Sequence, residues 1–195
     1  LERGEPARRE PLSDAERKAL RSLDLLTLKP VVYVANVPED HGLAPAPAAE
    51  RLRSEVAAHD PGSEVVEVSA RFEAELLELP ETERPEFLRA HGLEESGLAR
   101  LIRAGYRTLG LHTFFTMGDK QVRAWTLPVG ARAPAAAGEV HTDFARGFIR
   151  AETIHYDQFV TVGSLKAARE KGLIRYEGRE YVVRDGDILL FRTSA

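Results

Sequence analysis

The sequence contains no cysteine, and no apolar run approaches the roughly 18 residues that a membrane-spanning helix needs. The first absence excludes disulfide bonds and thiolate chemistry. The second excludes a helical membrane span, and the opening residues LERGEPARREPLSD lack the apolar centre of a signal peptide. We therefore expect a cytoplasmic protein without a membrane partner.

Several catalytic and metal-binding patterns are also missing. The six histidines include no pair spaced by four residues, so no metal site is predicted. His141 and Asp143 are close in sequence, but no Gly-x-Ser-x-Gly accompanies them, and we expect a capped turn with Phe144 packed inward. The chain contains no Gly-x-x-x-x-Gly-Lys-Ser/Thr and no Gly-Lys pair. We therefore predict no catalytic residue and no cradle for nucleotide phosphates.

What is present is an ordinary globular composition with an uneven charge. The 195 residues are 43% hydrophobic and 30% charged, which allows a buried core. Residues 1–104 carry 14 basic against 21 acidic side chains, whereas residues 105–195 carry 13 against 10. This change of sign predicts two units with different partners. Because the first residue is Leu rather than Met, we expect the sequence to be part of a longer protein.

The first half is predicted to be α/β. Ser13 and Glu16 form a capping-box pattern that begins a helix over 13–23. Strands are predicted over 31–36 and 63–70, and the amphipathic segment 46–60 between them favours a βαβ unit in an open parallel sheet. Further helices are predicted over 71–79, 81–92 and 95–110.

From residue 111 onward the apolar period becomes two, which predicts a β-rich α+β module. The segments 111–118 and 122–130 are predicted to form a hairpin. A further strand is predicted over 147–154, and helices over 132–140 and 163–172. The segment 179–193 is predicted to form two strands around a turn at Asp185-Gly186.

The stretch KPVVYVANVPED, residues 29–40, runs from a strand directly into a polar turn. In an open parallel sheet, ligands bind beyond the carboxyl ends of the strands, and Asn36 and Ser69-Ala70 stand at two such ends. An asparagine side chain has both a donor and an acceptor, so Asn36 can read the edge of a purine. From the local sequence alone, the favoured alternative is a structural turn that Asn36 and Glu39 merely cap.

Five stretches, in this order, closely resemble the C-terminal half of Obg-like ATPases of the YchF type, which are TRAFAC P-loop NTPases. They are KPVVYVANVPED, VSARFEAEL, GLARLIRAGYRTLGLHTFFTMGDKQVRAWTLPVG, AAGEVHTDFARGFIRAE and EGREYVVRDGDILLFR. The resemblance covers nearly the whole chain. It implies the end of a helical insertion at 1–28, the C-terminal part of a P-loop nucleotide-binding parallel sheet at 29–105, and a TGS domain with an α+β β-grasp (ubiquitin-like) fold at 106–195.

The resemblance also implies which residues read the base. Relatives of this family carry Asn-Lys-x-Asp at this turn, and its Asp accepts hydrogen bonds from guanine donors that adenine lacks. Here the turn is Asn36-Val37-Pro38-Glu39, which resembles an adenine-reading motif. Because Asn36 alone fits either purine, guanine use stays open. The implied adenine-binding residues are Asn36, Val37, Glu39, Ser69, Ala70 and Arg71.

The activity implied for the intact parent protein is ATP hydrolysis coupled to association with ribosomes or RNA. The phosphate loop and the Mg²⁺ site of the family lie upstream, so the chain alone is expected to be inactive. The alternative is a non-catalytic β-grasp module that binds RNA or protein. No reading of DNA sequence is expected.

The basic residues of the second half are the candidate contacts to RNA or the ribosome. Their small positive excess is compatible with such a surface without establishing one. Arg123 and Trp125 share one face of a strand, where Trp125 can stack on a base. The favoured alternative is that Trp125 packs in the core with Arg123 at its rim. The other candidates are Arg146, Arg150, Arg175, Arg179 and Arg184.

Overall fold

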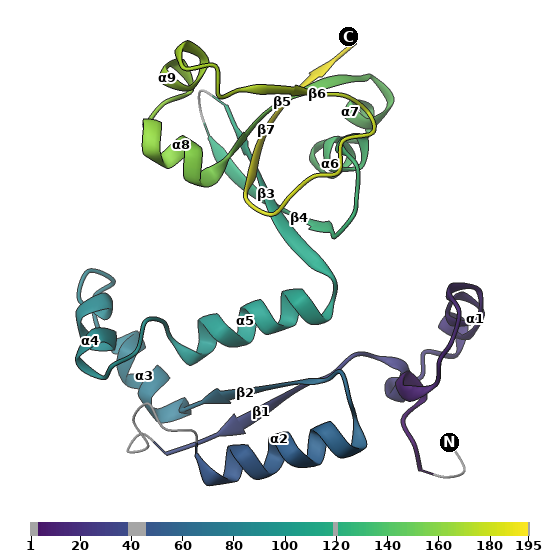
Figure 1. The fold of residues 1–195 in the computed structure, drawn as a ribbon, viewed down its shortest axis with the longest axis vertical. Helices are drawn as coiled ribbons and strands as arrows, with labels where there is room; N and C mark the ends of the chain where they lie inside the picture. The colour runs from purple at the N-terminus through teal and green to yellow at the C-terminus, as the bar shows by residue number, and fades with distance from the viewer. Residues whose placement is uncertain (1–3, 39–45, 119–120, 195) are drawn as a thin grey trace. The chain divides into compact units, whose positions relative to one another are not determined.

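The computed structural model describes residues 4–38, 46–118 and 121–194. The chain divides into two compact units, Leu1–Leu109 and Gly110–Ala195, and each is described here by itself. Figure 1 shows the order of the helices and strands along the chain. Within the described ranges, no helix is both long enough and apolar enough to span a membrane.

The first unit is built on two parallel strands with a helix on either side. β1 (Val32–Asn36) pairs with β2 (Glu64–Val68) in parallel, which confirms the predicted pairing. α2 (Pro47–His59) and α5 (Gly97–Thr108) lie on opposite sides of the two strands (Figure 1). Val66 of β2 and Val56 of α2 are buried, as the apolar sequence of these two elements predicts.

The rest of the first unit is helical. α1 (Asp14–Leu20) begins with the predicted capping box, in which the Ser13 amide donates to the Glu16 carboxylate at 2.8 Å and the Glu16 amide donates to Ser13 Oγ at 3.4 Å. The remaining elements are η1 (Ala7–Arg9), η2 (Arg21–Leu23), η3 (Leu26–Leu28), α3 (Ala70–Glu78) and α4 (Arg84–Ala90).

The second unit is a five-stranded mixed sheet in the order β4-β3-β7-β5-β6. β3 and β7 are parallel at its centre, and every other neighbouring pair is antiparallel. The predicted hairpin is confirmed as β3 and β4. The strands are β3 (Leu111–Met117), β4 (Val122–Pro128), β5 (Phe148–His155), β6 (Arg175–Glu177) and β7 (Asp187–Thr193).

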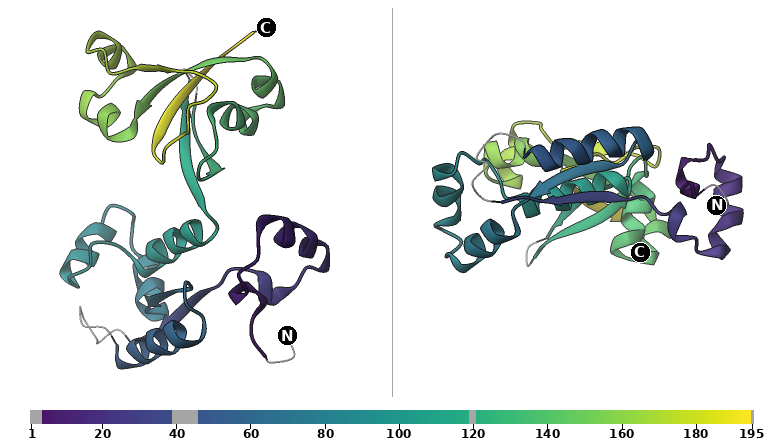
Figure 2. Two further views of the ribbon diagram at one scale, coloured as in Figure 1. Left: turned by 45° about the vertical axis from the view of Figure 1, so that its right-hand side comes forward. Right: turned by 90° about the horizontal axis from the view of Figure 1, so that it is seen from below.

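Helices pack on both faces of this sheet. Phe114 and Leu189 pack with the alanines of α6 on one face, which we call the α6 face. Ile154 and Ile188 pack with residues of α8 and α9 on the other, the α8 face. The ribbon views show α6 and α7 on one side of this sheet and α8 and α9 on its other side (Figures 1 and 2). The helices are α6 (Ala133–Val140), α7 (Thr142–Arg146), α8 (Tyr156–Val162) and α9 (Leu165–Glu170).

Two expectations for the second half are wrong. The segment 179–193 is not a hairpin, because β7 inserts between β3 and β5 while Val182 forms only an isolated bridge to Arg132. Gly186 does adopt the left-handed φ of 78° that favours glycine at a turn. Phe144 does not pack inward, since 37% of it is exposed. Both errors have one cause, namely that long-range partners are not encoded in the local pattern.

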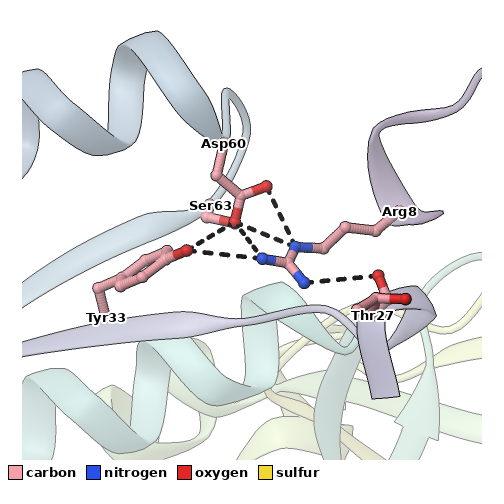
Figure 3. Close-up of polar contacts among 5 residues, drawn as sticks. All are labelled: Arg8, Thr27, Tyr33, Asp60 and Ser63. Carbon is pink, nitrogen blue, oxygen red and sulfur yellow. Dashed lines mark hydrogen bonds and ion pairs between the residues drawn. The ribbon is translucent and has the colours of Figure 1, made fainter. Parts of the chain in front are cut away.

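A polar cluster around Asp60 ties the N-terminal segment to the first sheet (Figure 3). Arg8 donates to both carboxylate oxygens of Asp60, with a shortest distance of 2.6 Å, and also to the Thr27 carbonyl. The hydroxyls of Tyr33 and Ser63 each donate to the same carboxylate at 2.9 Å. The Asp60 side chain is 6% exposed. The bonds from Arg8 lower the pKa of the Asp60 carboxyl, although burial opposes this.

Replacing Arg8 with alanine should destabilise the first unit, because it leaves the buried Asp60 carboxylate without its charged donor. We expect a loss of about 1.5–3 kcal/mol, measured by hydrogen exchange of the β1 and β2 amides near neutral pH. The folded-state pKa of Asp60 is depressed, so its contribution is present above the ordinary carboxyl pKa of about 3.9 and disappears as the pH falls through the folded value. The exposed neighbour Arg9, replaced by alanine, is the control. Equal effects of the two variants would contradict the role of the cluster.

Candidate functional site

The carboxyl ends of β1 and β2 bring the predicted base-reading residues together. The register sets Asn36 opposite Val68, so Val37 and Ser69 leave the sheet at the same edge. The Val37 amide donates to the Val68 carbonyl at 3.0 Å, and the Ala70 amide donates to Asn36 Oδ1 at 3.1 Å. One main-chain and one side-chain hydrogen bond therefore join the two strand ends.

The Asn36 side chain is exposed at this edge. Because its Oδ1 accepts from Ala70, its other polar atom, Nδ2, has no acceptor among the described residues and can donate to a ligand. N7 of a purine is a suitable acceptor. Asn36 thus joins the end of β1 to the start of α3, and its use as a base-reading donor stays a prediction.

The first turn of α3 forms the other part of the edge. Ser69 is the N-cap of this helix, and its Oγ accepts from the Phe72 amide at 3.4 Å. Ala70 and Arg71 are exposed, and Arg71 Nε donates to Glu75 one turn further along at 3.3 Å. Glu39, the last residue of the predicted motif, lies outside the described residues. The edge therefore consists of Asn36, Val37 and the start of α3.

The sequence analysis did not identify Glu73 and Gly97, two residues that pack next to this edge. Glu73 Oε1 accepts from the Gly97 amide at 2.6 Å and so ties α3 to the start of α5. Gly97 is buried, and a Cβ added to it would lie 3.2 Å from the Val68 Cα atom and 3.1 Å from Glu73 Oε1. The signal in the sequence is a glycine directly after a capping serine, Ser96, where a helix former is the commoner choice.

The candidate contacts of the second unit do not share one surface. Trp125 is half-buried against the core of the α6 face, and its Nε1 donates to Thr116 Oγ1 at 2.8 Å. The Arg123 guanidinium lies 5.4 Å from the centre of the Trp125 ring. This arrangement agrees with the favoured interpretation, in which Trp125 packs in the core with Arg123 beside it.

Arg175 and Arg179 also have partners within the fold. Arg175 Nη2 donates to the Tyr181 hydroxyl at 3.1 Å and lies 3.6 Å from the buried carboxylate of Asp187. Burial, together with the hydrogen bond to Asp187, raises the pKa of Tyr181 to about 12. Arg179 donates to the Phe148 carbonyl at 3.0 Å. Both arginines therefore serve the α6 side of the unit.

The other three candidates are exposed. Arg146 and Arg184 form no ion pair within the described ranges. Arg150 lies on the α8 face, where its guanidinium is 4.8 Å from the centre of the Tyr176 ring. Arg150 and Trp125 therefore lie on opposite faces of the sheet and cannot belong to one contact surface.

Comparisons with known proteins identify the relatives of this arrangement. Residues 111–194 match the family YchF-GTPase_C, described as a protein of unknown function (DUF933). The chain is 53% identical over 180 residues to the ribosome-binding ATPase YchF of Escherichia coli O157:H7, with 92% of the chain and 49% of the relative covered. It is 44% identical over 192 residues to the protein of that name from Bacillus subtilis, covering 98% of the chain and 52% of the relative.

A solved structure shares the fold. The Schizosaccharomyces pombe YchF GTPase superposes with a TM-score of 0.82 at 33% identity, covering 98% of this chain and 51% of that one. The chain is homologous to the C-terminal half of YchF proteins. This confirms the family that the five sequence stretches indicated. The chain spans about half the length of the YchF relatives it matches.

Two glycines of α5 allow a matched test of the support behind the edge. Alanine normally stabilises a helix by about 0.5–1 kcal/mol relative to glycine, and we expect this gain at Gly105, where an added Cβ meets nothing within 4 Å. At Gly97 we expect a loss of about 1–3 kcal/mol instead, because the Cβ crowds Val68 and displaces Glu73. Urea unfolding followed by circular dichroism measures both. A similar gain at Gly97 would show that the edge is not tightly packed there.

Proposed function

We propose that this chain is the C-terminal half of an ATP-binding and ATP-hydrolysing YchF protein, and that it supplies adenine recognition together with a ribosome- or RNA-binding TGS domain. The observation that carries the proposal is the joined edge of β1 and β2, where Asn36 Nδ2 has no acceptor among the described residues and lies beside the first turn of α3. The names of the relatives, ribosome-binding ATPases, support both the nucleotide and the partner. Because ribosomes lie in the cytoplasm, the proposed location of the protein is cytoplasmic.

In this proposal Asn36 and the backbone around Val37 contact the adenine, while Glu39 shapes the turn. Ser69, Ala70 and Arg71 border the base from the start of α3. In Asn-Lys-x-Asp the aspartate accepts from guanine N1–H, and here Glu39, whose side chain is one methylene longer, stands in its place. Adenine is therefore the proposed base, and guanine is the alternative.

The proposed domains are residues 1–28 as the end of a helical insertion, 29–105 as part of the nucleotide-binding sheet, and 106–195 as the TGS domain. Exposed apolar residues support the second assignment, because Val34 of β1 is 46% exposed and Ile102 of α5 is 53% exposed. Such side chains suit a sheet that continues into an upstream half. The sheet order β4-β3-β7-β5-β6, with its parallel central pair, supports a β-grasp fold for the third.

The proposal assigns the phosphates and Mg²⁺ of ATP to residues outside this chain. Within the described ranges, no group of histidines and carboxylates is suited to a metal ion. The sequence also has no phosphate-binding loop. We assign both functions to the upstream half of the parent protein, where the groups that position the attacking water also belong.

The isolated chain should therefore not hydrolyse ATP. We expect no phosphate release above background when the purified 195-residue chain is incubated with ATP and Mg²⁺. Joining it to the upstream half of the Escherichia coli relative should restore turnover, since that half supplies the phosphate loop. Phosphate release by the chain alone, at a rate comparable to that of the joined protein, would refute the assignment.

Asn36 should contribute to purine binding in that joined protein. Replacing Asn36 with alanine removes the free donor and the bond to Ala70, so we expect ATP affinity to fall about 3- to 12-fold. Calorimetry with ATP and GTP measures this affinity, and Ser54→Ala on the exposed side of α2 is the control.

Tighter binding of GTP than ATP would favour the guanine alternative. Ribosome binding that is indifferent to ATP or ADP would favour a non-catalytic module.

A further inference from the structure

The α8 face of the second sheet is only partly covered by helices. Ile154 and Ile188 pack under α8 and α9. Further along the same face, beyond these helices, the side chains are exposed. Tyr176 of β6 is 60% exposed and the Arg192 side chain of β7 is 50% exposed, with Arg150 of β5 exposed beside them. These three residues define what we call the arginine–tyrosine surface.

Two positive charges are set directly opposite each other on this surface. Arg150 and Arg192 are cross-strand partners in the antiparallel pair β5–β7. Like charges in that position lower the stability of a sheet. Within the described ranges Arg150 has no anionic partner, and its guanidinium instead lies over the Tyr176 ring. The surface therefore holds a charge that the fold itself does not neutralise.

A buried carboxylate fixes the neighbouring arginines. Glu152 is 8% exposed, and its Oε1 accepts from Arg192 Nε at 2.9 Å and lies 2.8 Å from Arg192 Nη2 in the same ion pair. Its Oε2 accepts from Arg169 Nη2 at 3.2 Å. Burial opposes its ionisation, but the bonds from Arg192 and Arg169 prevail and lower the pKa of Glu152. One carboxylate thus orients two guanidinium groups, while Arg150 has no anionic partner within the described ranges.

We propose that Arg150, Tyr176 and Arg192 form a binding surface for single-stranded RNA. The inference rests on the proposed association with ribosomes or RNA and names the surface that makes it. Unpaired bases stack on aromatic rings and on guanidinium planes, so a base can extend the Arg150–Tyr176 stack. Arg192 and Arg169, already oriented by Glu152, offer their remaining donors to phosphates. An acidic protein segment matches the charge but makes no use of the exposed stack.

The test is fluorescence anisotropy of a labelled oligouridylate of about 10 nucleotides with the complete 195-residue chain. We expect Arg150→Gln to weaken binding about tenfold and Tyr176→Ala about 5- to 100-fold. Tyr176→Phe keeps the ring and should keep the affinity. The control is Arg132→Gln, which removes the same charge from an exposed pair with Glu180 away from this surface, and should change the affinity less than about twofold.

Several results would overturn the proposal. Equal weakening by Arg150→Gln and Arg132→Gln would mean that only net charge matters. Absence of binding by the unaltered chain would exclude RNA as the ligand, provided circular dichroism shows that the chain is folded. The slope of log affinity against log salt should also become shallower by about 0.7 in Arg192→Gln for one lost phosphate contact. An unchanged slope together with unchanged affinity in that variant would remove Arg192 from the surface.

Cosedimentation with ribosomes separates this inference from the proposed function. If the unaltered chain and the Arg150→Gln and Tyr176→Ala variants cosediment equally, the surface is wrong while ribosome association stands. If the unaltered chain does not cosediment, ribosome association fails, and anisotropy alone decides the surface. If the variants no longer cosediment with ribosomes but bind oligouridylate with unchanged affinity, the surface contacts a ribosomal protein, and the RNA proposal is overturned.

Discussion

The parallel pairing of β1 with β2 is the constraint on which the candidate nucleotide site depends. Its register sets Asn36 beside Val68, and only then can the Ala70 amide reach Asn36 Oδ1. A slip of one residue would turn Asn36 toward the other face of the sheet. Gly97 packs against β2 at this position, because a Cβ added to it would crowd Val68, and its amide also binds Glu73 of α3. The chemistry at the edge is therefore specified by packing that lies outside it.

Arginine-paired carboxylates organise both units. Asp60, Glu152 and Asp187 are all buried, and each is approached by at least one guanidinium. Arginine suits this role better than lysine, because its planar fork bonds a carboxylate through two nitrogens and remains charged. In the first unit the pair anchors the N-terminal segment to the sheet. In the second unit Glu152 orients the guanidinium groups of Arg169 and Arg192 at the proposed arginine–tyrosine surface. The same type of ion pair therefore has a structural role in one unit and a proposed binding role in the other.

Features encoded by local patterns could be predicted, and features set by distant partners could not. Periodicity and caps indicated α1, β1, α2 and β2, and the strand-end rule then led to Asn36 and Ser69. The three residues of β6 are too few to give a periodic signal, so the pairing of Tyr176 with Arg150 was invisible. The same holds for Gly97 and Glu73, which meet across 24 residues of sequence. The position of β7 between β3 and β5 likewise depends on the whole sheet.

The acidic groups near the edge bear on the proposed choice of purine. Glu67 lies near the carboxyl end of β2 and is engaged by Arg53 at 2.5 Å, and Glu73 lies in the first turn of α3 and is engaged by the Gly97 amide. These contacts restrain the two carboxylates without using all of their acceptor sites. The donor on Asn36 fits N7, which adenine and guanine share, and so cannot distinguish them. In the proposed site Asn36 therefore does not select between the bases, and the selection is assigned to the rest of the motif.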